Sequence, residues 1–107
     1  MKNIEDVLKE FKERLRMVYK NNLKEVILYG SVARGESTEE SDIDVLVVLS
    51  KIVNFDEEFN KIFEIELEIA RKYDDKIMIS ALPVSEEDYH SRFTPLFLNI
   101  RKEGIPV

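Results

Sequence analysis

Two aspartates and a glycine–serine pair have types and a spacing that could bind a metal ion and phosphate groups. Gly30 and Ser31 follow an apolar run, ten residues intervene, and Asp42 and Asp44 then enter a second apolar run. Side chains alternate between the two faces of a strand, so Asp42 and Asp44 share a face, about 7 Å apart. Two carboxylates at that separation repel each other unless a cation lies between them.

The chemistry that these residues suggest is nucleotidyl transfer. Mg²⁺ is a hard cation that takes one or two carboxylates and fills its shell with phosphate oxygens, which suits Asp42 and Asp44. If the two apolar runs pair as antiparallel strands, Gly30 and Ser31 lie opposite Asp42. Gly30 would let a triphosphate approach the backbone, the Ser31 hydroxyl would donate to phosphate oxygens, and Arg34 would add positive charge. A hydroxyl could then displace pyrophosphate in line.

The same residues also have purely structural interpretations. An Asp-x-Asp pair before an apolar strand, taken alone, is more typical of a turn and a strand start than of a metal site. The Gly-Ser pair at its fixed distance is the feature that favours the metal site. Ser31 could instead be the N-cap of a following turn. Arg34 could equally be a surface ion-pair partner.

The elements that would position these residues follow from hydrophobic periodicity. The second long helix is predicted by Phe55, Phe59, Ile62, Phe63, Ile69 and Ala70. The third strand is expected to stop at Pro83, which cannot donate to a ladder. In chain order we expect a helix over 3–19, a strand over 23–29, a polar loop over 31–41 with one turn near 32–34, a strand over 43–49, a helix over 55–73, a strand over 77–82, a short helix opened by Ser85, and a last helix from Pro95 to before Gly104.

This order of elements predicts an α/β protein with a small mixed β-sheet and helices packed against it. The run over 43–49 is almost continuously apolar, which is typical of a central strand covered on both faces. The 107 residues fit a single domain over 1–107, and 44% hydrophobic residues can form a core without disulfides.

Composition excludes several other classes of protein. Sixteen Lys and Arg against 22 Asp and Glu give a net charge of -6, so direct nucleic-acid binding is not expected. The longest apolar stretch, over 45–49, is far shorter than the ~20 residues of a membrane span. The absence of Cys and a mixed charged and apolar start predict a cytoplasmic protein without a signal peptide.

The stretch from Gly30 to Asp44 resembles the minimal nucleotidyltransferases of the DNA polymerase β superfamily. The resemblance implies the nucleotidyltransferase fold, related to the polymerase β palm, with Mg²⁺ as cofactor and ATP as donor. Members of the family resemble antitoxins that transfer AMP to a tyrosine of a small helical HEPN-domain toxin. The matching residues are Gly30, Ser31, Ala33, Arg34, Gly35, Ser41, Asp42, Ile43 and Asp44.

The resemblance also implies a third carboxylate from a neighbouring strand. The predicted third strand contains no acid, but Asp74 and Asp75 lie just before it. By strand alternation Asp75 shares a face with Ile77. It therefore reaches a metal only if that face also carries Asp42 and Asp44. Asp75, Asp74 or no residue at all remain open as the third metal ligand.

Three functions remain open from the sequence. The first is transfer of AMP to a hydroxyl on a partner protein, because 107 residues leave little room for a separate acceptor-binding domain. The second is a catalytically weak or inactive module of the same fold that acts by binding its partner, in a homo- or hetero-oligomer. The third is a transferase for a small molecule such as an aminoglycoside, which would need a roomy acidic pocket.

Overall fold

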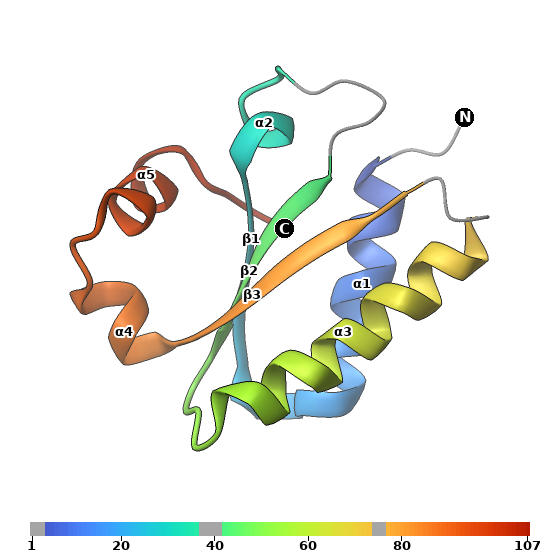
Figure 1. Cartoon of the computed structure of the whole chain (residues 1–107), viewed down its shortest axis with the longest axis horizontal. Coiled ribbons are helices and arrows are strands. Elements are labelled where there is room, and N and C mark those ends of the chain that lie inside the picture. The colour runs from blue at the N-terminus through green and yellow to red at the C-terminus, as the bar shows by residue number, and fades with distance from the viewer. Residues whose placement is uncertain (1–3, 37–41, 74–76) are drawn as a thin grey trace.

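The computed structural model describes residues 4–36, 42–73 and 77–107, and four strands form one sheet with helices on both faces (Figure 1). The strands are β1 (Leu23–Tyr29), β2 (Ile43–Leu49), β3 (Ile79–Ser85) and β4 (Ile105–Pro106). The helices are α1 (Ile4–Tyr19), the 3₁₀ turn η1 (Lys20–Asn22), α2 (Gly30–Ala33), α3 (Phe55–Lys72), α4 (Glu86–Ser91) and α5 (Pro95–Glu103).

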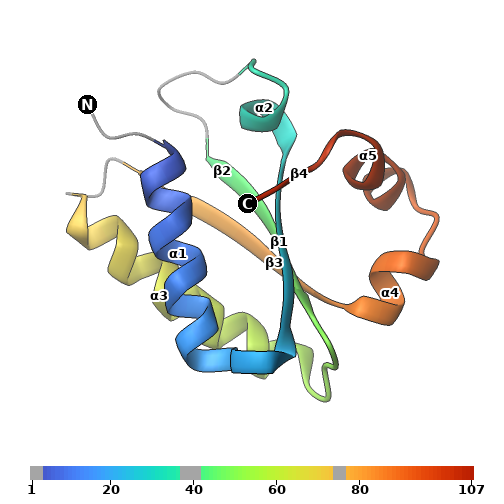
Figure 2. The ribbon, with the colours of Figure 1, turned by 180° about the vertical axis from the view of Figure 1, so that it is seen from behind.

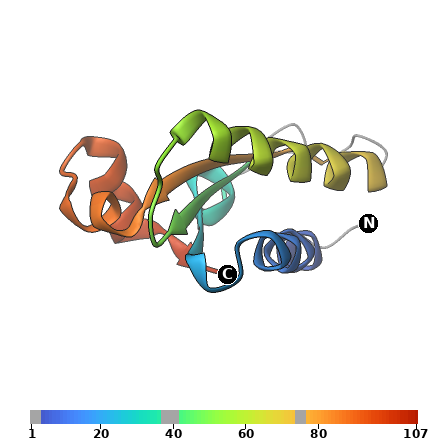
Figure 3. The same ribbon diagram turned by 90° about the horizontal axis from the view of Figure 1, so that it is seen from below.

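The sheet is mixed, as the sequence predicts. Its strand order is β3-β2-β1-β4; β1 pairs antiparallel with β2 and with β4, whereas β2 and β3 are parallel. Helices α1 and α3 cover one face, and α4 and α5 lie on the other (Figures 1 and 2). The view from below separates the same two helix pairs (Figure 3). Within the described ranges, no helix is both long and apolar enough to cross a membrane.

Strand β2 is buried on both faces because a helix layer covers each of them. Val45 and Val47 pack in the cluster that holds the buried faces of α1 and α3. Leu46 and Val48 pack in a second cluster with residues of α4 and α5. The continuous apolar run of β2 therefore identified a central strand correctly.

Strand β3 does not stop at Pro83 as expected, because it is an edge strand. The N–H of Ile43 donates to the carbonyl of Met78 at 2.9 Å, so even-numbered residues of this segment face β2 and odd-numbered ones face the open edge. Pro83 is odd-numbered, and its missing N–H removes no ladder bond. The N–H of Ala81, on the same open edge, donates to Glu66 Oε1 at 2.6 Å.

Strand β4, which follows α5 after Gly104, was not predicted from the sequence. This strand pairs only Ile105 and Pro106 with β1, and the N–H of Val107 donates to the carbonyl of Val26 at 2.9 Å. Two residues are too few to show strand periodicity. The pairing gives β1 a neighbouring strand on each side, so the strand that leads into Gly30 is hydrogen-bonded along both edges.

Helix α3 carries a wider apolar arc than the sheet covers. The N-cap is the predicted one, since Asn54 Oδ1 accepts from the N–H of Glu57 at 3.1 Å. Ile62 and Ile69 are buried, as expected from the periodicity, and Ile65 is buried as well. In contrast, Phe55, Phe59 and Phe63 are 45%, 39% and 42% exposed. Periodicity placed these three rings on the apolar stripe, but it cannot show how far a sheet extends beneath a helix.

Glu66 is a buried acid on α3. Only 6% of it is exposed, and burial raises its pKa to about 7, opposed by the hydrogen bond from the N–H of Ala81. The unfolded chain titrates this group near 4.5. Between these two values the folded chain holds the extra proton, so stability falls as the pH rises through that window.

We expect Glu66→Gln to flatten this pH dependence. The amide keeps an acceptor for Ala81 but carries no charge, so its advantage over the parent should grow from near zero at pH 4 to about 3 kcal/mol above pH 7. Urea unfolding between pH 4 and pH 8 measures the difference, with the exposed Glu64→Gln as a matched control on the same helix. Equal pH slopes for parent and Glu66→Gln would contradict the assignment.

Candidate active site

The pairing of β1 with β2 brings the Gly-Ser turn beside the aspartates. The two strands are antiparallel, as predicted, with Tyr29 paired to Asp44. The chain therefore leaves β1 at the end where β2 begins, and α2 starts at Gly30 (Figure 1). Asp42 directly precedes β2 and is exposed, whereas Asp44 is half-buried. The even-numbered positions of β2 face α4 and α5, so the site opens on that side of the sheet.

Gly30 is the residue that lets this turn close on the carboxylate. Its φ of +77° lies in the left-handed region that side chains disfavour. A Cβ built on it would lie 3.2 Å from both Cβ and Cγ of Asp44 and still closer to Oδ2. Both the backbone conformation and the close approach therefore require glycine.

The electrostatics of the carboxylate pair favour a bound cation. Burial raises the pKa of Asp44, the charge of Asp42 raises it further, and Arg34 opposes both effects. A cation between the two carboxylates would relieve their repulsion. Among the described residues no three His, Cys, Asp or Glu side chains gather as a metal site. Two carboxylate donors fit Mg²⁺, which keeps waters and takes the remaining ligands from substrate phosphates.

Ser31 is inside α2, not its N-cap, so the structural interpretation of its hydroxyl was wrong. The N-cap position of α2 is Tyr29, and no side chain caps it. The carbonyl of Ser31 accepts from the N–H of Glu36 at 2.9 Å. The Ser31 hydroxyl is therefore not used to cap α2. Its role as a hydrogen-bond donor to a phosphate oxygen stays a prediction.

Arg34 does form the surface ion pairs that were its alternative role. Its Nε lies 3.2 Å from Glu36 Oε2, and its Nη1 lies 4.0 Å from Glu103 Oε2. Its positive charge nevertheless lowers the pKa of Asp44, so it contributes to the potential at the site. A bound triphosphate would have to compete with two glutamates for this guanidinium.

Ser80 is a site residue that the sequence did not reveal. It pairs with Asp44 across the parallel ladder and is exposed, so Tyr29, Asp44 and Ser80 form one row across three strands. Burial raises the pKa of Tyr29, and the charge of Asp44 adds to this effect. The signal for Ser80 would have been the register of β2 on β3, which no local pattern in the sequence specifies.

Asp74 and Asp75 lie outside the described residues, so the third metal ligand stays a prediction. The strand that follows them can still be placed. Ile79 pairs with Ile43, and both pack in the cluster under α1 and α3, on the face away from Asp44. Ile77 packs against the same cluster. The face shared by the odd-numbered residues of this segment is thus not the face of the two aspartates.

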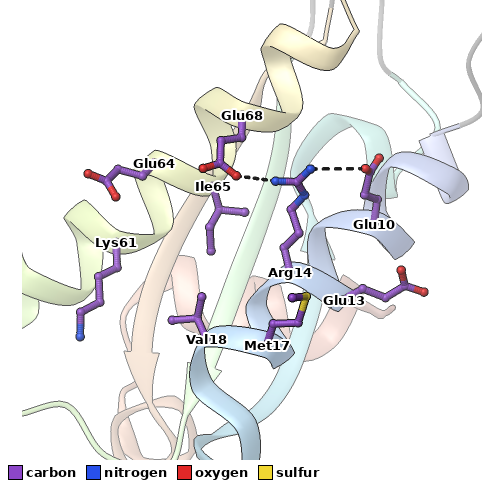
Figure 4. A pocket seen from close by; sticks show the side chains of 9 residues that line it. All are labelled: Glu10, Glu13, Arg14, Met17, Val18, Lys61, Glu64, Ile65 and Glu68. Carbon is purple, nitrogen blue, oxygen red and sulfur yellow. Dashed lines mark hydrogen bonds and ion pairs between the residues drawn. The ribbon is translucent and has the colours of Figure 1, made fainter.

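A groove of about 630 Å³ between α1 and α3 lies on the opposite face of the sheet from the aspartates (Figure 4). Met17, Val18 and Ile65 line its apolar part, and Arg14 bridges Glu10 and Glu68 across it. None of its lining residues belongs to the Gly-Ser turn or to the aspartates, so the groove is not part of the candidate active site.

Comparison with known families identifies the chain. The model of the nucleotidyltransferase domain family matches residues 4–101, which contain the turn, both aspartates and all the helices except the last two residues of α5. The chain belongs to this family. Its class of reaction is therefore nucleotidyl transfer, and the mixed sheet with its helices is the nucleotidyltransferase fold.

Relatives of this nucleotidyltransferase occur in Methanocaldococcus jannaschii. One, named "Putative protein adenylyltransferase", is 36% identical over 103 residues, which are 95% of each chain. A second with the same name is 40% identical over 77 residues, 72% of this chain and 75% of the relative.

Solved structures share the fold of this nucleotidyltransferase. A structure titled "putative minimal nucleotidyltransferase" superposes with a TM-score of 0.59 at 22% identity, covering 99% of this chain and 97% of the other. A toxin-antitoxin structure with AMP-PNP gives a TM-score of 0.59 at 19% identity over 92% of this chain and 70% of the other.

We expect Gly30→Ala to cost more stability than Gly35→Ala. Both glycines have positive φ, +77° and +73°, so both variants carry about 1–2 kcal/mol of backbone strain. Only Gly30 adds a collision with Asp44, since no described atom lies within 4 Å of a Cβ at Gly35. Chemical denaturation of both variants measures the difference. Equal losses would show that the close approach to Asp44 is not tight.

Proposed function

We propose that this nucleotidyltransferase transfers AMP from MgATP to a tyrosine hydroxyl of a partner protein. We further propose that the partner is a small helical HEPN-domain toxin and that the transfer neutralises it. The observation that carries the proposal is the packing of Gly30 against Asp44, which places an open backbone turn next to two carboxylates. The names of the relatives support a protein as the acceptor, and the toxin-antitoxin neighbour supports a toxin as the partner.

Each residue of the site has a role that follows from its position. Asp42 and Asp44 would hold Mg²⁺, which when bound neutralises charge on the triphosphate and makes the attacking hydroxyl more acidic. Gly30 leaves the backbone free for the phosphates to approach, and the Ser31 hydroxyl donates to a phosphate oxygen. The acceptor oxygen then bonds to the α-phosphorus as the bond to pyrophosphate breaks.

The exposure of Asp42 and Ser80 suits an acceptor that arrives from outside the chain. Both are open to solvent, on the face of the sheet that carries α4 and α5. A tyrosine of a second protein would reach this end of the sheet without a rearrangement of the core.

The alternative is a module that keeps the fold and acts by binding its partner. The observation that favours it is the row Tyr29–Asp44–Ser80. At this position β3 contributes the hydroxyl of Ser80 beside the carboxylates, where a third carboxylate would be needed for efficient transfer. With two carboxylates among the described residues of the site, ATP binding could persist while turnover is slow.

Labelled ATP distinguishes the two functions. We expect the parent chain with Mg²⁺ and a co-expressed HEPN-domain partner to place one AMP on a partner tyrosine, detected by mass spectrometry. Asp44→Asn should reduce the labelling by at least about 100-fold, because one of two metal ligands is lost. The matched control is Asp6→Asn, an exposed acid on α1.

Two outcomes would contradict the enzyme. Tight partner binding with no label, under conditions where calorimetry shows that MgATP binds, would favour the binding module. Undiminished labelling by Asp44→Asn would remove the carboxylate pair from the chemistry. Because both variants replace an acid by its amide, a change in net charge alone cannot explain a difference between them.

The third ligand can be tested with Asp75→Asn, alongside Ser80→Ala. If Asp75 completes the metal site, the amide should reduce turnover at saturating MgATP far more than it weakens ATP binding, because the third carboxylate acts mainly in the transition state. If Asp75 is a turn residue, asparagine serves equally well and turnover stays parental. In that case a loss in Ser80→Ala would show that β3 contributes its hydroxyl instead.

A further inference from the structure

Helix α3 presents an unusual row of side chains to solvent, which we call the α3 stripe: Phe55, Phe59, Phe63, Leu67 and Arg71. Residues four apart are neighbours on a helix surface, so the five form a continuous row that winds around the helix by about 40° per step. The three rings stack along it, with centroid distances of 6.0 Å and 6.4 Å. Each ring is about two-fifths exposed, and because the three are adjacent, their exposed surfaces add up to one aromatic patch.

The neighbourhood of the stripe disfavours strand addition and favours a helical contact. Glu66, one position from Leu67, reaches the open edge of β3 and accepts the N–H of Ala81. Pro83 removes the N–H at the next edge position. An added strand would find these two donors unavailable, whereas a helix needs no backbone partner and could pack on the rings.

The charges of α3 are self-complementary. Its first turn holds Asp56, Glu57 and Glu58, and its last turn holds Arg71 and Lys72. Neither Asp56 nor Arg71 has an ion pair with another described residue, and both are exposed. A second α3 laid antiparallel would bring each acidic start alongside a basic end.

We propose that the α3 stripe binds the α3 stripe of a second copy of this chain, forming a two-fold symmetric dimer. With the axis near Phe63, Phe59 lies beside Leu67 of the second copy, and Asp56 lies beside Arg71 of the second copy. Such an interface is isologous, so each contact occurs twice. The groove between α1 and α3 is a poorer choice, because its four glutamates outnumber Arg14 and Lys61 and would repel a second copy.

The dimer leaves the candidate active site open. The stripe belongs to the helix layer on one face of the sheet, and Asp42 and Asp44 belong to the other. Stripe variants should therefore change the association of the chain without changing its MgATP binding.

Charge exchange provides the sharpest test, by sedimentation equilibrium of the whole chain. We expect Asp56→Arg and Arg71→Asp each to weaken dimerisation about tenfold or more, because each places like charges together twice. The double variant should restore the parental dimer. The two positions are 15 residues apart on one helix, about 22 Å, so a bond within one chain cannot explain the restoration.

A second pair of variants tests the rings. Phe59→Glu should give monomer, whereas Phe93→Glu, at a 74% exposed ring between α4 and α5, should leave the dimer intact. Circular dichroism melts identify any variant that fails to fold. If a phenylalanine variant does not fold, the charge-exchange variants alone test the dimer. A monomeric parent at the highest soluble concentration, a double variant that stays monomeric, or equal loss in both phenylalanine variants would overturn the proposal and assign the stripe to a different protein.

Discussion

The antiparallel pairing of β1 with β2 is the constraint on which the site depends. It aligns Tyr29 with Asp44, and so brings the end of one strand and the start of the next to the same point. Gly30 can then turn away with a left-handed backbone directly against the carboxylate. A shift of one residue in this register would send Asp44 to the opposite face, where the core lies under α1 and α3. The register is fixed because such a shift would bury the charge of Asp44 in that apolar core.

The same pairing imposes an electrostatic cost that the core must offset. Asp44 is half-buried next to Asp42, and its raised pKa records how unfavourable its charge is in the chain alone. The buried residues of β2 lie immediately beyond it and anchor the strand between two helix layers. The pair is therefore a cost to the stability of the chain alone, as charged residues at functional sites commonly are. Arg34 relieves part of the cost while remaining tied to Glu36 and Glu103.

The parts of the fold that the sequence predicts are those set by local patterns. Strands β1 and β2 have the predicted bounds because apolar runs and the Gly30 turn define them within a few residues. The family match confirms the reaction class that the spacing from Gly30 to Asp44 suggested. What failed depends on distant partners. Pro83 is tolerated only because β3 has an open edge, and Ser80 joins the site only through the register of β3 on β2. The exposure of Phe59 likewise depends on where the sheet ends, which periodicity along one helix cannot report.

The arrangement of the two faces explains how one small sheet can serve both a reaction and an assembly. The proposed chemistry lies at the strand ends on the side of α4 and α5, where Asp42 is exposed. On the other side α3 closes the core with its isoleucines and leaves its three phenylalanine rings about two-fifths exposed. Glu66 lies between these two roles, because its hydrogen bond with Ala81 occupies one donor on the open edge of β3. A second copy and an acceptor protein would therefore contact different faces, and neither would have to leave for the other to bind.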